Sequence, residues 1–200
     1  PIERYERRLY DAIDGKRTVA EIVDRLASDI DKPEILSIAA GHLREAELTD
    51  ALKQRRLGRW VALDSDVQSL QEIHKCYARY GVETFPGTVR QLLSRKAKLG
   101  KFDFIYSTGQ YDYLQQPLGR RLTTRLFEML NPGGQLLIAN FLNGIGERGY
   151  MESYMAWNLV FRSHSDMLDL AMAIDQKEVN DIRLRADDNR VTLFLHVSRR

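Results

Sequence analysis

A glycine and an acidic residue, each directly after a predicted strand, are the residues of this chain best suited to hold a ligand. Gly41 lies in the turn after the apolar run 34–39, and Asp64 follows the run 60–63, 23 residues further along. A small residue in the first turn lets an anionic group approach the backbone, and an acid about 20 residues later accepts hydrogen bonds from ribose hydroxyls. The spacing indicates a nucleoside site, with an ordinary tight turn at Gly41 and a helix N-cap at Asp64 as the alternatives.

The elements that must position these residues alternate between strand and helix. Short apolar runs predict strands buried on both faces, and the helical periodicity between them predicts helices. The predicted strands cover residues 34–39, 60–63, 82–85, 102–107 and 135–139, and the predicted helices cover residues 44–54, 66–80, 89–95 and 118–130. The tail differs, because the runs 178–185 and 191–197 predict an antiparallel hairpin.

This alternation predicts an α/β fold with a doubly wound (Rossmann-like), seven-stranded, mostly parallel sheet and a C-terminal antiparallel hairpin. Two amphipathic helices precede the first strand, at residues 2–13 and 19–30, and a capping-box pattern from Thr18 to Glu21 opens the second. We therefore predict an N-terminal helical extension over residues 1–32 and one main domain over residues 33–200. Because the chain begins with Pro1 instead of methionine, we also expect a missing upstream segment.

The segment 102–142 carries the most informative pattern. An apolar strand ends in Ser107-Thr108-Gly109, and Asn131-Pro132-Gly133-Gly134 is predicted to stop a helix and lead into the next strand. This order resembles the fourth and fifth strands of class I S-adenosylmethionine-dependent methyltransferases. The resemblance implies that residues 33–200 form a methyltransferase domain. It also implies that S-adenosyl-L-methionine is the cofactor and binds where the strands end.

The resemblance also assigns cofactor contacts to the loops after the strands. Methyltransferases usually place three glycines in the first turn, whereas this chain keeps only Gly41, with Ala39 and Leu43 at the other two positions, so Leu43 must point away from the ligand. Thr88 and Val89 are expected near the adenine. The complete predicted cofactor set is Ala39, Ala40, Gly41, His42, Asp64, Ser65, Thr88, Val89, Ser107, Thr108 and Gly109.

A narrower resemblance covers about residues 35–199. The motifs 106–114, 151–162 and 189–197 look like a bacterial methyltransferase family that makes 3-hydroxypalmitic acid methyl ester, a quorum-sensing signal. Where those proteins commonly have a histidine after the tryptophan, this chain has Asn158. The resemblance implies methyl transfer to a small-molecule oxygen acceptor, the carboxylate of a hydroxy-fatty acid.

The acceptor side offers cations and aromatic rings but no obvious base. An ionised carboxylate needs no strong general base, so no catalytic residue is assigned. Arg148 or Arg162 is expected to orient the acceptor, and the predicted substrate-binding set is Tyr111, Tyr113, Asn140, Arg148, Tyr154, Trp157 and Arg162. Residues 151–162 are predicted to be helical, with one apolar stripe that faces either the core or a pocket. Asp112 is either a base for a hydroxyl or amine acceptor or a solvated loop aspartate.

The sequence Gly144-Ile145-Gly146-Glu147-Arg148-Gly149 matches the dinucleotide pattern G-x-G-x-x-G. It follows the fifth strand instead of the first, and no second strand ending in an acid comes after it. We interpret it as a flexible loop or substrate lid near an anionic ligand.

The composition of the chain argues against several other kinds of partner and binding site. The chain has 30 basic and 28 acidic residues and a formal net charge of +2, so no overall field draws it to nucleic acid or an anionic membrane. The basic runs 53–56 and 95–98 are most simply solvated helix ends, because no stacking aromatics accompany them. Cys76 is the single cysteine, the four histidines are scattered, and no metal site is predicted. No apolar run approaches the ~20 residues that span a bilayer.

These observations predict a cytoplasmic enzyme with a small-molecule substrate, no nucleic-acid or membrane partner and an undetermined oligomeric state. Two alternatives remain open. A methyltransferase fold that has lost catalysis and serves as a sensor or interaction module is motivated by the altered glycine turn. An NAD(P)-dependent oxidoreductase is motivated by the Gly144–Gly149 match.

Overall fold

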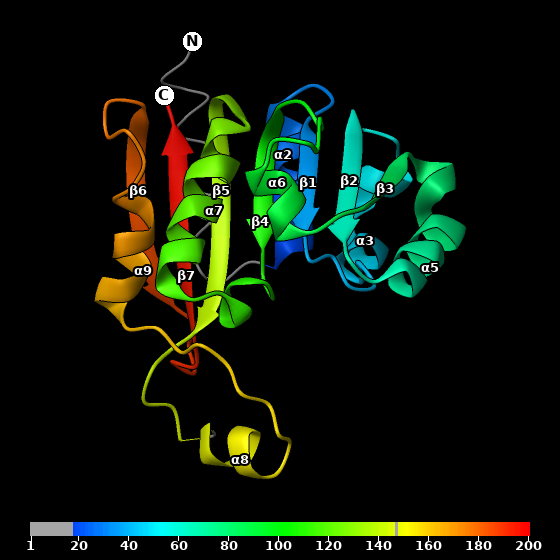
Figure 1. The fold of residues 1–200 in the computed structure, drawn as a ribbon. Coiled ribbons are helices and arrows are strands. Elements are labelled where there is room, and N and C mark those ends of the chain that lie inside the picture. Colours follow the sequence, from blue (N-terminus) through cyan, green and yellow to red (C-terminus); the bar gives the residue numbers. More distant parts are fainter. Residues whose placement is uncertain (1–17, 147) are drawn as a thin grey trace.

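A seven-stranded sheet runs through the part of the chain that the structure, a computed structural model, describes: residues 18–146 and 148–200 (Figure 1). Its strand order is β3-β2-β1-β4-β5-β7-β6. The strands are β1 (Glu34–Ile38), β2 (Arg59–Asp64), β3 (Val82–Pro86), β4 (Phe102–Ser107), β5 (Leu130–Phe141), β6 (Val179–Ala186) and β7 (Thr192–Arg199). β1 to β5 are parallel, and β7 lies antiparallel between β5 and β6. The predicted fold class and the terminal hairpin are confirmed.

Helices cover both faces of the sheet. Successive residues of the central strands point to opposite sides, so the apolar residues on each side pack against helices of their own. Ile35 and Trp60 pack in one cluster with α2 (Val19–Asp29), α3 (Glu45–Leu48), α4 (Asp50–Lys53) and α5 (Val67–Tyr77). Leu36 and Val61 pack in the other cluster with α6 (Val89–Leu93), α7 (Gln116–Glu128) and α9 (His164–Ala171). The strand order reverses beside β1, so a crevice is expected where β1 and β4 end.

The described part of the predicted extension includes α2, which packs on this sheet. α2 begins with the predicted capping box, in which Thr18 and Glu21 bond each other's backbone. Val23 and Leu26 of α2 are buried in the same cluster as Trp60. The other predicted helix, at residues 2–13, lies outside the described residues.

Two element predictions need correction. The helix expected over 44–54 is broken at Thr49, whose extended backbone separates α3 from α4. The corner expected at Asn131-Pro132-Gly133-Gly134 does not stop α7, which already ends at Glu128. The four residues form an irregularity inside β5, where pairing with β4 jumps between Leu130 and Gln135. A Cβ at Gly134 would lie 2.8 Å from the Asn131 carbonyl oxygen, so only glycine fits there.

Between β5 and α9 the chain leaves the sheet in an excursion, residues 142–162, that projects beyond the carboxyl ends of the parallel strands (Figure 1). It contains α8 (Arg148–Ser153). The helix predicted through residue 162 is wrong, because α8 ends at Ser153 and Ala156 adopts a left-handed φ of 51°. A β-bridge between Leu142 and Arg162 joins the first and last residues of the excursion, and we call this pair its neck. None of the described helices is both long and apolar enough to cross a bilayer.

A buried histidine in β7 makes the stability of this fold depend on pH. Burial lowers the pKa of His196 from its usual 6.5 to about 4, and its Nε2 lies 2.9 Å from Gln135 Oε1. Arg183 lowers the pKa further and Asp181 opposes it. A depressed native pKa gives stability that is full above pH 6.5 and is lost as pH falls towards 4.

We expect His196 to remove about 2 kcal/mol of unfolding free energy between pH 7 and pH 5. Urea denaturation of wild type and His196→Gln at both pH values measures this, as the difference between their pH dependences. The exposed His74→Gln is the control and should follow wild type. Parallel pH dependences for wild type and His196→Gln would contradict the assignment.

Candidate functional site

The turn after β1 has left-handed backbone at all three positions where glycine was expected, although only Gly41 is a glycine. Ala39, Gly41 and Leu43 have φ values of 55°, 53° and 50°, so every second residue is left-handed. The Leu43 side chain is buried with Ile35 and Trp60, and thus points into the core as expected. A Cβ at Gly41 would meet no atom within 4 Å. The turn therefore presents open space at its centre.

This conformation gives a stability prediction. A non-glycine residue in the left-handed region costs about 1–2 kcal/mol, which glycine relieves at some cost in unfolded-state entropy. We expect Ala39→Gly to raise the free energy of unfolding by about 0.5–1 kcal/mol in urea denaturation. Ala40→Gly, one residue along with an ordinary φ, is the matched control and should lower it. Equal losses for both variants would show that Ala39 is not strained.

Asp64 lies directly beside this turn. The Gly41 N–H donates to Asp64 Oδ2 at 2.8 Å, and the Asp66 N–H donates to Asp64 Oδ1 at 2.9 Å. The structure thus brings together the two residues that the sequence paired. Asp64 is not the N-cap of α5, because Asp66 fills that position and accepts from the Gln68 N–H. The partly exposed Asp64 carboxylate retains lone pairs for further donors.

A cavity of about 240 Å³ opens at these strand ends. Five residues of the predicted cofactor set line it: Ala39, Asp64, Ser65, Thr88, which caps α6, and Val89, which begins α6. The sequence reasoning missed Leu63, Gly87, Arg90, Gln110 and Leu114, which also line it. Gly87 could have been found, because a glycine directly after β3 is a signal for close backbone approach.

The other predicted cofactor residues are not among those that line the cavity. His42 turns to the surface, where its Nδ1 lies 2.9 Å from Glu72 Oε2 of α5. Ser107 is buried at the end of β4, and its hydroxyl has no hydrogen-bond partner among the described residues. Thr108 is exposed, and a Cβ at Gly109 would meet nothing within 4 Å. Ala40 takes part through its backbone, whose N–H donates to the Leu63 carbonyl at 3.2 Å.

Arg162 is a buried structural hub, not an acceptor-binding cation. Its guanidinium donates to the carbonyls of Tyr111 and Leu114, to Asn140 Oδ1 and to Gln116 Oε1. The side chain is 1% exposed. With four of its five N–H donors occupied, Arg162 has no reach to a substrate carboxylate. The expected roles of Arg162, Asn140 and Tyr111 in acceptor contact are therefore not met, since all three side chains lie inside the protein.

Asp112 is not a solvated loop aspartate. It lies in η2 (Tyr111–Tyr113), directly after the loop that follows β4, and is 4% exposed. Its Oδ1 accepts the Phe141 N–H at 2.9 Å, and its carbonyl accepts the Val160 N–H at 2.7 Å. Burial raises the pKa of the Asp112 carboxyl, while the Phe141 N–H and Arg162 oppose the shift. Asp112 thus joins β5 to the return of the excursion.

Two aromatic residues of the predicted acceptor side, Tyr113 and Trp157, contact each other. Trp157 Nε1 donates to the Tyr113 hydroxyl at 2.7 Å, and the Trp157 ring meets Phe141 edge-on at 5.9 Å between centroids. This pair connects the excursion to η2 and the end of β5. Tyr154 is 78% exposed. Arg148 of α8 pairs with Glu152 at 2.8 Å and lies over the Phe161 ring.

The glycine motif 144–149 lies on the excursion after β5, and therefore not at the turn after β1. Gly144 has a φ of 86°, and Cβ atoms at Gly144, Gly146 and Gly149 would meet nothing within 4 Å. Among the described residues, no cluster of histidine, cysteine or acidic side chains suits a metal ion.

The fold resembles solved methyltransferases. The S-adenosylmethionine-dependent methyltransferase SibL, in its apo form, shares 16% identity over 98% of this chain and 55% of its own, with a TM-score of 0.65. The N-methyltransferase NodS from Bradyrhizobium japonicum WM9, in complex with S-adenosyl-L-homocysteine, shares 15% identity over 99% of this chain and 97% of its own, with a TM-score of 0.63. The carbon methyltransferase CurJ shares 9% identity over 90% of this chain and 53% of its own, with a TM-score of 0.67.

This chain spans about half the length of SibL and of CurJ. No protein-family model and no curated protein sequence matches it. At such low identities the likeness establishes the class I methyltransferase fold, while the chemistry must be argued from the site.

Proposed function

We propose that this chain is an S-adenosylmethionine-dependent methyltransferase acting on a small-molecule oxygen acceptor. The observation that carries the proposal is the hydrogen bond from the Gly41 N–H to Asp64, a residue that lines the 240 Å³ cavity. A methyltransferase fold places its nucleoside at the ends of β1 and β2, where this contact lies. A cytoplasmic location, and the absence of nucleic-acid and membrane partners, belong to the same proposal.

The residues present fit the nucleoside end of this cofactor. Asp64 offers carboxylate lone pairs to ribose hydroxyls, and Gly41 leaves open space beside it. Val89 and Leu63 give the cavity apolar walls for a base. The Ser107 hydroxyl, buried at the end of β4, has no hydrogen-bond partner in the described part of the chain. The cavity is smaller than the ~300–1,000 Å³ of typical ligand sites, which suits the nucleoside part alone.

When bound, S-adenosyl-L-methionine supplies a methyl group that a nucleophilic oxygen displaces in line, and the protein contributes mainly proximity and alignment. The acceptor we favour is the carboxylate of a hydroxy-fatty acid, as in the quorum-sensing methyl esters of the resembling family. Such an acid is already ionised at neutral pH, so no residue has to act as its base. Tyr113 and Trp157 form an aromatic edge for an acyl chain, and Arg148 on α8 supplies a cation.

Native mass spectrometry of the purified protein tests the proposal. We expect a mass increase from S-adenosyl-L-methionine or its demethylated product, and methyl ester formation when 3-hydroxypalmitic acid is added. Cofactor binding without ester formation would reject the acceptor and keep the class. Failure to retain or bind either form of the cofactor would reject the class.

A second candidate is a methyltransferase-fold sensor or interaction module without catalysis. The observation that favours it is the replacement of two turn glycines by Ala39 and Leu43, both held left-handed. A purified protein that neither retains nor binds the cofactor would support it. The nicotinamide alternative has lost its motive, because the Gly144–Gly149 motif lies after β5 and not in the turn after β1, where a dinucleotide fold binds the pyrophosphate.

A further inference from the structure

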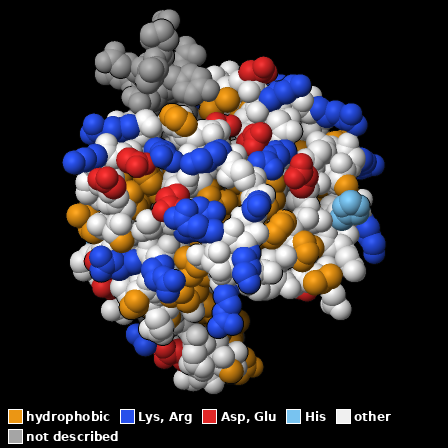
Figure 2. Space-filling model, turned by 45° about the horizontal axis from the view of Figure 1, so that its top comes forward, with side chains coloured by type: hydrophobic (Ala, Val, Ile, Leu, Met, Phe, Trp, Pro, Cys, Tyr) orange, Lys and Arg blue, Asp and Glu red, His pale blue; other side chains and the backbone are white. Residues whose placement is uncertain are grey.

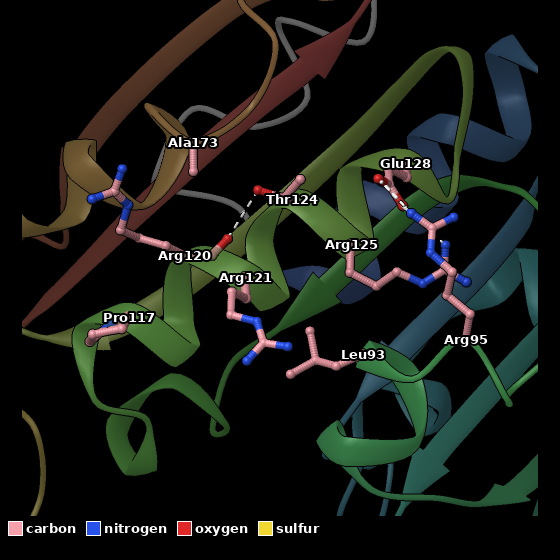
Figure 3. Close-up of a pocket in the computed structure, with 9 residues that line it drawn as sticks. All are labelled: Leu93, Arg95, Pro117, Arg120, Arg121, Thr124, Arg125, Glu128 and Ala173. Atoms are coloured by element: carbon pink, nitrogen blue, oxygen red, sulfur yellow. Dashed lines mark hydrogen bonds and ion pairs between the residues drawn. The ribbon is translucent and has the colours of Figure 1, made fainter.

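A groove of about 470 Å³ lies on the helical face formed by α6, α7 and α9, away from the strand ends. Figure 3 shows its lining, which shares no residue with the cavity at Gly41 and Asp64. Four arginines line it, Arg95 from the loop after α6 and Arg120, Arg121 and Arg125 from α7, together with one carboxylate, Glu128. The volume lies within the ~300–1,000 Å³ range of small-molecule sites.

Positive side chains outnumber negative ones in this groove. Glu128 pairs with both Arg95, at 2.8 Å, and Arg125, at 3.3 Å. Arg120 lies 3.5 Å from Asp169 of α9. Arg121 is exposed and has no hydrogen-bond or ion-pair partner within the described part of the chain. In Figure 3 its guanidinium extends from α7 towards Leu93 of α6 and lies free in the groove.

This surplus is local, because the whole chain carries a net charge of only +2. Arg121 and Arg125 are four residues apart on α7, a spacing at which like charges repel by about 0.2–0.5 kcal/mol. Helix stability alone would favour an acid at one of these positions. An external anion removes the repulsion, which gives the arrangement a physical reason.

The positive surface continues past Glu128. A second cavity of about 460 Å³ shares Arg95, Arg125 and Glu128 with the groove and adds Lys101 and Arg199, with Glu178 on its rim. Burial lowers the pKa of Lys101, and neighbouring Arg199 lowers it further. Figure 2 shows Lys and Arg side chains gathered across this face.

We propose that the groove binds a small phosphorylated molecule through a diphosphate group. Guanidinium groups bond phosphate oxygens in a bidentate manner, and Arg121 offers such a fork to one phosphoryl group. Arg125 lies one turn along α7 and offers its remaining Nη2 to the neighbouring phosphoryl group, since its Nε donates to the Leu92 carbonyl and its Nη1 to Glu128. Leu93, Pro117 and Ala173 form apolar walls for the rest of the ligand. A nucleic-acid strand fits less well, because none of the described residues that line the groove is aromatic and could stack with bases.

Calorimetry with inorganic pyrophosphate, and separately with ADP, tests the proposal on the full chain. We expect saturable 1:1 binding of both that weakens as salt rises, and about tenfold weaker binding by Arg121→Ala. Tighter binding of ADP than of pyrophosphate would place an organic moiety on the apolar walls. Arg190→Ala, an exposed arginine on the β6–β7 turn, is the matched control and should bind like wild type.

Three outcomes would overturn the proposal. The first is no pyrophosphate or ADP binding at millimolar concentration. The second is equal weakening in Arg121→Ala and Arg190→Ala, which would indicate diffuse attraction. The third is tighter binding of octaglutamate than of either phosphate compound, which would indicate an acidic protein partner. S-adenosyl-L-methionine affinity should be unchanged in Arg121→Ala, so this test stands apart from the proposed function.

Discussion

Arg162→Met is expected to lower the free energy of unfolding by about 4 kcal/mol. The substitution keeps an unbranched apolar stem but leaves the carbonyls of Tyr111 and Leu114 and the Asn140 amide oxygen buried without their donor. Each such loss costs about 1–3 kcal/mol, and the contacts are not additive. A loss this large removes much of the stability of a typical domain.

Urea denaturation measures the effect, and Arg148→Met is the matched control. Arg148 makes a partly exposed pair with Glu152 on the excursion, so its loss should cost less than about 1 kcal/mol. Protease sensitivity should also rise within residues 142–162 in Arg162→Met, because Arg162 holds the neck of the excursion. Similar stabilities for the two variants would refute the hub assignment.

Asp64→Asn is expected to weaken S-adenosyl-L-methionine binding about 30-fold or more. The amide keeps one acceptor oxygen for the Gly41 N–H but loses the charge that strengthens hydrogen bonds from ribose hydroxyls. Hydrogen bonds to charged groups contribute about 1.5–3 kcal/mol, and 1.4 kcal/mol corresponds to a factor of ten. Isothermal calorimetry gives the affinity, and a thermal melt of the same sample reports folding.

The control is Asp66→Asn, two residues away in the same loop. The Asp66 carboxylate bonds the Gln68 N–H and the Ser69 hydroxyl, so its change should touch the start of α5 and leave cofactor affinity within about threefold. Equal losses in both variants would mean that loop distortion, and not ribose recognition, explains the effect.

The sheet could be predicted because its sequence signals are local. Strands such as β1 and β2 are short apolar runs buried on both faces. The start of α2 is marked in the sequence by the capping-box residues Thr18 and Glu21. The break at Thr49 and the irregularity in β5 could not be predicted in this way. They depend on packing and strand pairing between residues distant in the sequence.

Part of the candidate site could also be predicted from local sequence signals, and part could not. Gly41 follows β1 and Asp64 ends β2, and these two strands are neighbours in the sheet, so the sequence pattern could predict that the two residues lie close together. Arginine and aspartate usually lie at a protein surface. Arg162 and Asp112 are buried only because the excursion folds back onto the sheet at its end. Gln110 and Leu114 reach the cavity because η2 folds over the end of β4, for which the sequence gives no periodic signal.

Hydrogen exchange of the full chain with and without S-adenosyl-L-methionine tests the central claim most directly. The claim is that the crevice beside Gly41 and Asp64 holds the nucleoside. It predicts slower amide exchange at residues 39–43, 64–66 and 87–90 when the cofactor is saturating, and little change at residues 118–128. No protection at the first three segments, or protection confined to residues 144–149, would contradict the account.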